Sequence, residues 1–415
     1  MNLGLPVAGA IIADTGGQTA RARWQGPMSA QGAESARSHP AILTHAGLVA
    51  MIAKLAAGGY TVIGPRLEAG AITLGPIGGA GELPVGVIDA QAPGHYRTTV
   101  AEGTETFASA APAMPWKRFL YPPQESLFHA RRAGNDFAIA AGPDEDEPPL
   151  ALFAVRACDL AAIAVLDAVL VSEERVTDER YLARRERTFI VAADCARAGD
   201  TCFCASMGTG PRAAGGFDLI LSEIPAGPAG GSGAQPARML VAAGSEQGAA
   251  LLAELDLVPA AAADCAAAEE ATARAAAAMK RTMPADIAAI LARNLEAPTW
   301  EGIAERCLGC ANCTMVCPTC FCASVEDTTD LDGTVAERRR VWDSCFTLEH
   351  SYIHGGGIRT SGAARYRQWM CHKLSFWHGQ FGMSGCVGCG RCITWCPVGI
   401  DITEEAWRFA HAEER

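Results

Sequence analysis

Two runs of four cysteines with one shared spacing, in the last third of the chain, constrain its fold more than any other feature. The spacing is C-x2-C-x2-C-x3-C, and each run ends in a Cys-Pro pair. The eight cysteines are Cys307, Cys310, Cys313 and Cys317 in the first run and Cys386, Cys389, Cys392 and Cys396 in the second. In bacterial ferredoxins three thiolates of such a run bind one [4Fe-4S] cluster, and the fourth cysteine reaches the other cluster. We therefore predict two clusters with crossed ligation, in which Cys396 completes the first cluster and Cys317 completes the second.

The residues between these cysteines suit the same chemistry. Two-residue gaps let a tight loop place three sulfurs on three corners of a cube. Gly309, Gly388 and Gly390 let backbone amides approach the cluster without a Cβ clash. Structural zinc is the alternative, because paired C-x2-C units can form a four-thiolate site. Zinc gives no reason for the third evenly spaced cysteine or for the Cys-Pro ending of both runs.

Composition excludes several classes of protein. The net charge of -12 argues against nucleic-acid binding, which selects a basic face. No apolar run is long enough to span a membrane, and the apolar N-terminus has no basic residues ahead of it. The 17 cysteines stand mostly in cluster-type spacings and not in a short disulfide-rich secreted chain. We therefore expect a cytoplasmic protein with reduced thiolates, most of them bound to iron.

The predicted fold class is a mixed α/β (α+β) N-terminal domain followed by a helical, ferredoxin-like domain that holds two [4Fe-4S] clusters. Residues 1–40 are rich in Gly, Ala, Ser and Gln and are expected to form a loose leader. The α/β domain is predicted over 41–298. The dicluster domain is predicted over 299–415, with a long insert at 323–385 between the two cysteine runs.

Hydrophobic periodicity predicts the elements of the first domain. Helices are expected at 42–57, 159–170, 179–187, 246–257, 264–279 and 284–295. Strands are expected at 60–63, 71–74, 85–88, 150–155, 188–193 and 217–221. After the Pro-Pro break at 122–123 we expect Gln124 to begin a helix. We expect Gly227 to Gly233 to form a loop.

Four further cysteines follow two of these strands. The strand at 150–155 leads to Cys158, and the strand at 188–193 leads to Cys195, Cys202 and Cys204. Open α/β sheets build their sites at the carboxyl ends of the strands, so these thiols are candidates for a third iron-sulfur site. Their spacing matches no standard run, and zinc or unligated core thiols remain alternatives. The hexapeptide Thr-Cys-Phe-Cys-Ala-Ser occurs at 201–206 and again at 319–324 beside the first ferredoxin run, which favours the iron-sulfur interpretation.

The stretch between the two cysteine runs holds Cys320, Cys322, Cys345 and Cys371, and whether they bind a further cluster is left open by their spacing. No Walker A sequence is present. Gly208-x-Gly210 fails as a dinucleotide fingerprint because Ala213 stands at its third position and no strand leads directly into it. No paired catalytic carboxylates or nucleophile-base pair are recognised. Nicotinamide or flavin chemistry is therefore expected on another chain.

Taken in order, the motifs resemble one family, the iron-sulfur beta subunit of sulfhydrogenases, which are cytoplasmic NAD(P)-linked [NiFe]-hydrogenases. The residues that carry the resemblance are Arg156-Ala-Cys158-Asp, Cys195 with Cys202-Phe-Cys204, Cys317-Pro-Thr-Cys-Phe-Cys322, Arg340-Val-Trp-Asp-Ser-Cys345, His354-Gly-Gly-Gly and Cys386-Val-Gly-Cys-Gly-Arg-Cys392. The resemblance covers about 116–402 and leaves the first hundred residues without a match. The chain is also similar to the corresponding iron-sulfur component of anaerobic sulfite reductases, although Trp-Asp-Ser-Cys345 and Cys371 favour the hydrogenase branch.

The resemblance implies an electron-transfer subunit without a substrate of its own. It would relay single electrons between a flavin- and NAD(P)-binding gamma-type subunit and the small and large [NiFe]-hydrogenase subunits. It also implies that Cys158, Cys195, Cys202 and Cys204 hold a third [4Fe-4S] cluster. Two alternatives are an electron-transfer subunit of a siroheme sulfite reductase and a self-sufficient reductase that binds flavin or a small substrate in its N-terminal domain. A third alternative is a protein whose clusters serve only its structure, and the net negative charge of the chain disfavours it.

Overall fold

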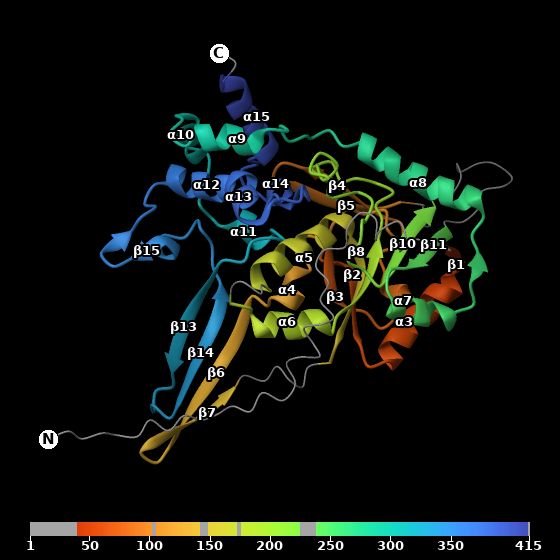
Figure 1. The fold of residues 1–415 in the computed structure, drawn as a ribbon, viewed down its shortest axis with the longest axis horizontal. Coiled ribbons are helices and arrows are strands. Elements are labelled where there is room, and N and C mark those ends of the chain that lie inside the picture. Colours follow the sequence, from red (N-terminus) through yellow and green to blue (C-terminus); the bar gives the residue numbers. More distant parts are fainter. Residues whose placement is uncertain (1–39, 102–104, 142–147, 172–175, 225–237, 414–415) are drawn as a thin grey trace.

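The computed structural model describes residues 40–101, 105–141, 148–171, 176–224 and 238–413. The expected leader at 1–39 and the expected loop at 227–233 lie outside these residues. The described chain forms an α/β part around a large sheet and a C-terminal helical part, and a narrow four-stranded sheet projects from the junction of the two (Figure 1). The two predicted structural classes, a mixed α/β region followed by a mainly helical region, are therefore confirmed.

The largest sheet in the described residues has eight strands in the order β12-β1-β11-β10-β9-β8-β2-β3. Its strands are β1 (Ala41–Leu43), β2 (Thr61–Glu68), β3 (Ala71–Pro76), β8 (Leu150–Arg156), β9 (Phe189–Ala193), β10 (Leu219–Ile224), β11 (Arg238–Ala243) and β12 (Val258–Pro259). The central strands β2, β8, β9 and β10 run parallel, and the outer strands pair antiparallel. The carboxyl ends of β8 and β9 therefore lie side by side, which brings Cys158 and Cys195 to one edge of the sheet.

Helices cover both faces of this sheet. They are α3 (His45–Ala57), α5 (Ala157–Leu170), α6 (Glu179–Glu186), α7 (Glu246–Ala253) and α8 (Ala262–Ala277). Alternate residues of β9 divide between two cores: Val191 packs on the side of α3 and α7, whereas Ile190 packs on the side of α5 and α6. Because both faces are covered, the central strands are almost continuously apolar, which made them recognisable in the sequence.

A separate four-stranded sheet, which we call the blade, has the order β13-β14-β6-β7. It joins β6 (Gln124–Ala133) and β7 (Asp136–Ala141) to β13 (Ala323–Thr329) and β14 (Val335–Trp342) of the insert. The expectation that Gln124 begins a helix is wrong, because Gln124 begins a strand. The cause is tertiary, since residues 124–131 pair with β14, about two hundred residues later in the chain.

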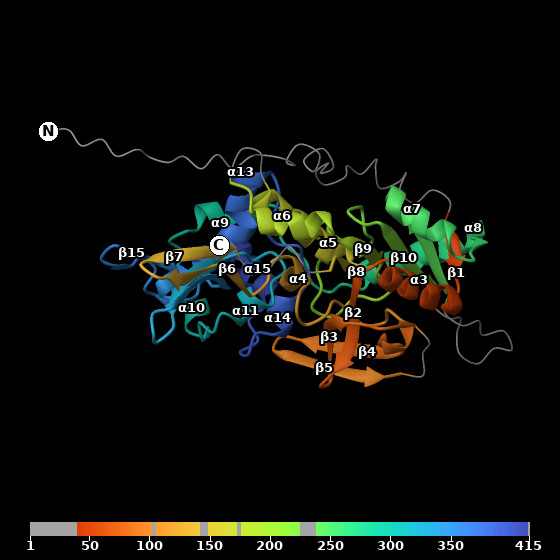
Figure 2. The ribbon, with the colours of Figure 1, turned by 90° about the horizontal axis from the view of Figure 1, so that it is seen from below.

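The hairpin of β4 (Val87–Ala92) and β5 (His95–Val100) lies beside β3 (Figure 2). It also contacts the second cysteine run: Tyr96 stacks on Trp395 at 5.0 Å between ring centroids, and the Gly94 amide donates to the Ile393 carbonyl at 3.1 Å. A Cβ on Gly94 would lie 2.8 Å from the carbonyl oxygen of Cys396. The hairpin therefore holds the C-terminal part against the large sheet.

Short helices wind around the two cysteine runs. They are α9 (Ile287–Arg293), α10 (Thr299–Ala304), α11 (Asn312–Met315), α12 (Gly362–Cys371), α13 (Trp377–Phe381), α14 (Arg391–Thr394) and α15 (Ile402–Glu413). The remaining elements are α4 (Lys117–Leu120), the small hairpin of β15 (Tyr352–Ile353) and β16 (Gly356–Gly357), 3-10 turns at Ala80–Glu82 and Glu349–Ser351, and a π-helical segment at His372–Phe376. One apolar core joins α9, α10, α12 and α15, with Trp300, Trp369 and Phe409 at its centre.

Candidate iron-sulfur centres

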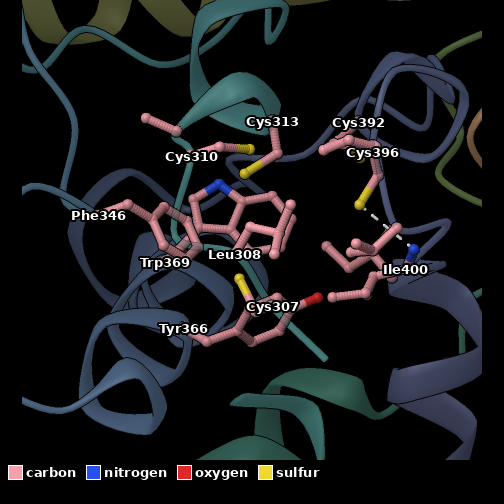
Figure 3. A pocket seen from close by; sticks show the side chains of 14 residues that line it. Cys307, Leu308, Cys310, Cys313, Phe346, Tyr366, Trp369, Cys392, Cys396 and Ile400 are labelled. Atoms are coloured by element: carbon pink, nitrogen blue, oxygen red, sulfur yellow. Dashed lines mark hydrogen bonds between the residues drawn. The ribbon is translucent and has the colours of Figure 1, made fainter. Parts of the chain in front are cut away.

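The first three cysteines of the first run and the last two of the second run, Cys392 and Cys396, line one pocket (Figure 3). The sulfurs of Cys307, Cys310, Cys313 and Cys396 surround this space, with the aromatic rings of Phe346, Tyr366 and Trp369 beside them. Backbone amides already donate to two of the sulfurs, from Gly309 to Cys307 at 3.4 Å and from Ile400 to Cys396 at 3.3 Å. Four thiol ligands in an apolar pocket, with backbone amides that donate hydrogen bonds to the sulfurs, fit a [4Fe-4S] cluster. The four residues are those that crossed ligation predicts, so we assign the first cluster to them as a proposal.

The second group of thiols consists of Cys386, Cys389 and Cys392, with Cys317 close to all three. Burial raises the pKa of Cys386 to about 12 and raises the pKa of Cys389 and Cys392. A hydrogen bond with Cys320 instead lowers the pKa of Cys317 well below its ordinary value, and nearby Lys373 acts in the same direction. The thiolate form of Cys317, which binding to iron requires, is thus favoured. The proximity of Cys317 to Cys386, Cys389 and Cys392 supports the crossed assignment of the second cluster.

A second pocket is lined by all four cysteines of the predicted third site, Cys158, Cys195, Cys202 and Cys204. Burial raises the pKa of each of these thiols. The guanidinium of Arg156, itself buried, acts on Cys195 in the opposite direction, towards the thiolate. The four thiols, which follow β8 and β9 in the chain, therefore lie around one pocket at the carboxyl ends of these strands. We retain the third cluster as a proposal.

The loop of the third site lies against the loop of the second cluster. The Phe203 amide donates to the Gly388 carbonyl at 2.9 Å, and the Thr209 hydroxyl donates to the Val387 carbonyl at 2.7 Å. Gly388 and Gly390 have positive φ angles of 64° and 76°. A Cβ on Gly388 would lie 2.7 Å from the backbone of Cys204, and one on Gly390 would lie 2.5 Å from the Thr201 carbonyl oxygen. These glycines are thus needed for contact between the two thiol groups as well as for the turn itself.

The four cysteines between the two runs, Cys320, Cys322, Cys345 and Cys371, are not gathered into one group. Cys322 and Cys345 form a hydrogen bond with each other, and Cys320 forms a hydrogen bond with Cys317. Cys371 is fully buried in α12, where burial raises its pKa to about 12 and Arg367 is the neighbouring charge that acts on it. Cys371 therefore stands apart from the other three, and we do not assign it to a cluster with them.

No three His, Cys, Asp or Glu side chains in the described part of the chain are arranged to hold a single metal ion.

Sequence reasoning missed the charged residues around these thiols. Arg391, between Cys389 and Cys392, forms a buried ion pair with Asp159, which follows Cys158. Lys117 and Lys373 are also buried, at 3% and 5% exposure, close to Cys317 and Cys320. A charged residue inside a cluster loop, as Arg391 is, could have been singled out for this reason. The partners of all three lie too far along the chain to be found from local patterns.

The comparisons with known proteins agree with this architecture. Residues 306–400 match the model of a family described as a 4Fe-4S dicluster domain, which indicates two [4Fe-4S] clusters. No solved structure matches. Over 293 residues the chain is 33% identical to sulfhydrogenase 2 subunit beta of Pyrococcus furiosus, covering 69% of this chain and 80% of that protein. The chain belongs to the sulfhydrogenase beta subunit family. This family membership confirms the predicted resemblance and extends well beyond the dicluster domain.

The dicluster match of this sulfhydrogenase beta subunit homologue spans residues 306–400, whereas the similarity to its relative covers 293 residues. What the two proteins share therefore extends into the α/β part. In the described residues, no helix combines the length and the apolar character that crossing a membrane requires.

Proposed function

We propose that this sulfhydrogenase beta subunit homologue carries single electrons through three [4Fe-4S] clusters between partner subunits. The clusters stand in the order third site, second cluster, first cluster. The partners that the family resemblance suggests are a flavin- and NAD(P)-binding gamma-type subunit on one side and the small and large [NiFe]-hydrogenase subunits on the other. When bound, each cluster would supply one-electron redox chemistry.

The observation that carries this proposal is the direct contact between the third thiol group and the second cluster loop. Residues 201–209 lie on residues 387–390 through one backbone–backbone hydrogen bond and one from the Thr209 hydroxyl to a backbone carbonyl, and the Thr201 and Thr394 hydroxyls are 2.7 Å apart. The first and second groups are linked in turn, because each cysteine run contributes ligands to both of them. Cys313 and Cys317 are four residues apart in the chain, and so are Cys392 and Cys396, so the first and second groups are joined by two short stretches of chain. Such proximity suits electron transfer from cluster to cluster.

The first cluster site provides the contact with a partner. All 17 cysteines lie in the described part of the chain, and among them only Cys310 is exposed to solvent. Leu308, at 67% exposure, and Val398, at 41%, flank it on the lining of the same pocket. An exposed ligand among exposed apolar residues is suited to bring the cluster close to the cofactor of a docked subunit.

Among the residues that the structure describes, we recognise no site for hydride chemistry. Gly208 and Gly210 belong to the loop of the third site, and a Cβ on Gly210 would lie 3.1 Å from the Cys204 sulfur. Gly210 thus serves the packing of the thiol group, and neither glycine opens a helix towards a dinucleotide. We therefore place nicotinamide and flavin chemistry on a partner, and we place the complex in the cytoplasm, where thiols stay reduced.

The test is anaerobic copurification followed by rapid-mixing kinetics. We expect the tagged chain to copurify with a flavoprotein and a [NiFe] pair, and we expect reduction of the flavin by NAD(P)H to be followed by reduction of the clusters. A siroheme partner would instead favour the sulfite-reductase alternative. Turnover of NAD(P)H by the isolated chain would contradict the proposal and favour a self-sufficient reductase.

A further inference from the structure

Lys373 is a buried lysine without a carboxylate partner among the described residues. Its side chain lies in the π-helical segment His372–Phe376, directly after α12, and the residue is 5% exposed. The ammonium group donates to the Cys317 sulfur at 3.2 Å and to the Thr319 hydroxyl at 2.8 Å. An isolated ammonium is costly to bury, so a nearby negative charge must compensate it.

The groups around Lys373 belong to the second cluster site. The Thr319 hydroxyl donates to the Gly385 carbonyl at 2.7 Å, and the Gly385 amide donates to the Lys373 carbonyl at 2.8 Å. Lys373 is thereby tied both to Cys317, from the first run, and to the residue before Cys386, from the second run. Cys317, Cys320 and Cys386 are the negative groups that act on its ammonium.

The first cluster site has a different environment. Its sulfur hydrogen bonds in the described residues come from the backbone amides of Gly309 and Ile400. The other buried lysine, Lys117, donates to the Cys320 carbonyl at 2.7 Å and lies 3.7 Å from the centre of the Trp342 ring. Lys373 is thus the lysine whose ammonium donates directly to a sulfur of an assigned ligand.

We propose that Lys373 is a positioning residue that raises the reduction potential of the second cluster relative to the first. The proposal deepens the proposed function and rests on it, because it requires that Cys317 binds the second cluster. Reduction adds negative charge to a cluster that already carries four thiolates. A fixed positive charge and an N–H···S hydrogen bond both stabilise that reduced state. The second cluster would then hold an electron more readily than the first, which favours transfer inward from the exposed site.

The test is an anaerobic redox titration of the full chain followed by electron paramagnetic resonance, with iron content measured on the same samples. The signal that disappears in C386S identifies the second cluster. In K373M we expect the midpoint potential of this cluster to fall while that of the first cluster stays unchanged. In K373R, which keeps the charge, we expect most of the original potential to return. K54M is the matched control, because Lys54 pairs with Glu254 on the surface at 2.8 Å.

Unchanged potentials in an iron-replete K373M protein would overturn the role of Lys373, and so would an equal fall for every cluster. Where K373M does not retain iron, K373Q decides the question, because glutamine keeps a donor without the charge. A lower potential in K373Q supports the proposal, and an unchanged potential overturns it. These outcomes leave electron transfer itself intact, whereas clusters that accept no electron in the wild-type chain would contradict the proposed function.

Discussion

Arg391 and Asp159 form a buried bidentate ion pair that joins the second cluster loop to the helix beginning at the third site. Both N–O distances are 2.9 Å, and the two side chains are 2% and 1% exposed. The remaining guanidinium nitrogen Nε donates to the Pro112 carbonyl at 2.7 Å. The residues are 232 positions apart in the chain, and each stands next to a candidate cluster ligand. The pair thus fixes the relative position of two thiol groups through side chains that bind no iron.

Removing one partner of this pair should be costly, because the other charge stays buried. We expect Asp159→Asn to destabilise the folded chain by about 3–5 kcal/mol, measured by anaerobic urea unfolding. The control is Asp327→Asn, which breaks the exposed pair with Arg338 at 2.7 Å on the blade and should leave the unfolding midpoint unchanged. Equal effects of the two substitutions would show that the buried pair has no special role.

The third site is tested by comparing two cysteines of the α/β part. Cys204→Ser should remove about four iron atoms per chain, because one of four thiolate ligands is lost. Cys265→Ser is the control, since Cys265 lies on α8 beside a different pocket, away from the other thiols. Iron and acid-labile sulfide are measured on anaerobically purified protein. Full iron content in Cys204→Ser would remove this residue from the ligand set.

Close packing between the cluster loops is tested at Gly390. Gly390→Ala places a Cβ 2.5 Å from the Thr201 carbonyl oxygen at a φ of 76°. The matched control is Gly382→Ala, which has a similar φ of 68° and no atom within 4 Å of the added Cβ. The control should cost about 1–2 kcal/mol from backbone strain alone. Gly390→Ala should cost about 1–3 kcal/mol more, because the overpacked loops must separate. Equal unfolding free energies for the two variants would contradict the contact.

Much of the large sheet could be predicted from the sequence, because its central strands are covered on both faces and appear as apolar runs. The predicted strands at 150–155 and 188–193 correspond to β8 and β9, and the predicted helix at 264–279 corresponds to α8. Cysteine spacing likewise identified the two ferredoxin runs, since the chemistry of a cluster fixes short gaps between ligands.

The blade and the charged network could not be predicted in the same way. The strand β6 is half-buried over most of its length, with Glu125 buried and Arg131 and Arg132 exposed, so its sequence lacks a regular apolar–polar alternation. The preceding prolines also suggest the start of a helix. Its pairing with β14 depends on residues about two hundred positions away. The Arg391–Asp159 pair and the approach of Lys373 to Cys317 are also long-range contacts, which no local pattern encodes.

His372 should make the folded chain sensitive to mild acid. Burial lowers the pKa of His372 to about 4, with Lys373 and Arg359 acting in the same direction, and its Nε2 accepts a hydrogen bond from Trp377 Nε1 at 3.1 Å. The unfolded chain, with an ordinary histidine pKa of 6.5, binds the proton more readily between pH 6.5 and 4. Stability therefore falls as the pH decreases through this window. Allowing for solvent screening, we expect a loss of about 1–2 kcal/mol.

The check on this prediction is the difference in unfolding free energy between pH 7 and pH 4.5 for wild type, His372→Gln and His411→Gln. His372→Gln should show the smaller pH dependence. His411→Gln should behave as wild type, because His411 is an exposed residue stacked on Trp407. The same pH dependence in all three proteins would assign the acid sensitivity to other groups.

The central claim is that the thiol groups hold three clusters that accept and pass on electrons. The most direct measurement is an anaerobic reductive titration of the purified chain, followed by electron paramagnetic resonance. Our account predicts uptake of about three electrons per chain, one for each [4Fe-4S] cluster, with signals broadened by coupling between neighbouring clusters. A chain that carries zinc at these cysteines, or iron that takes up no electron, would contradict it.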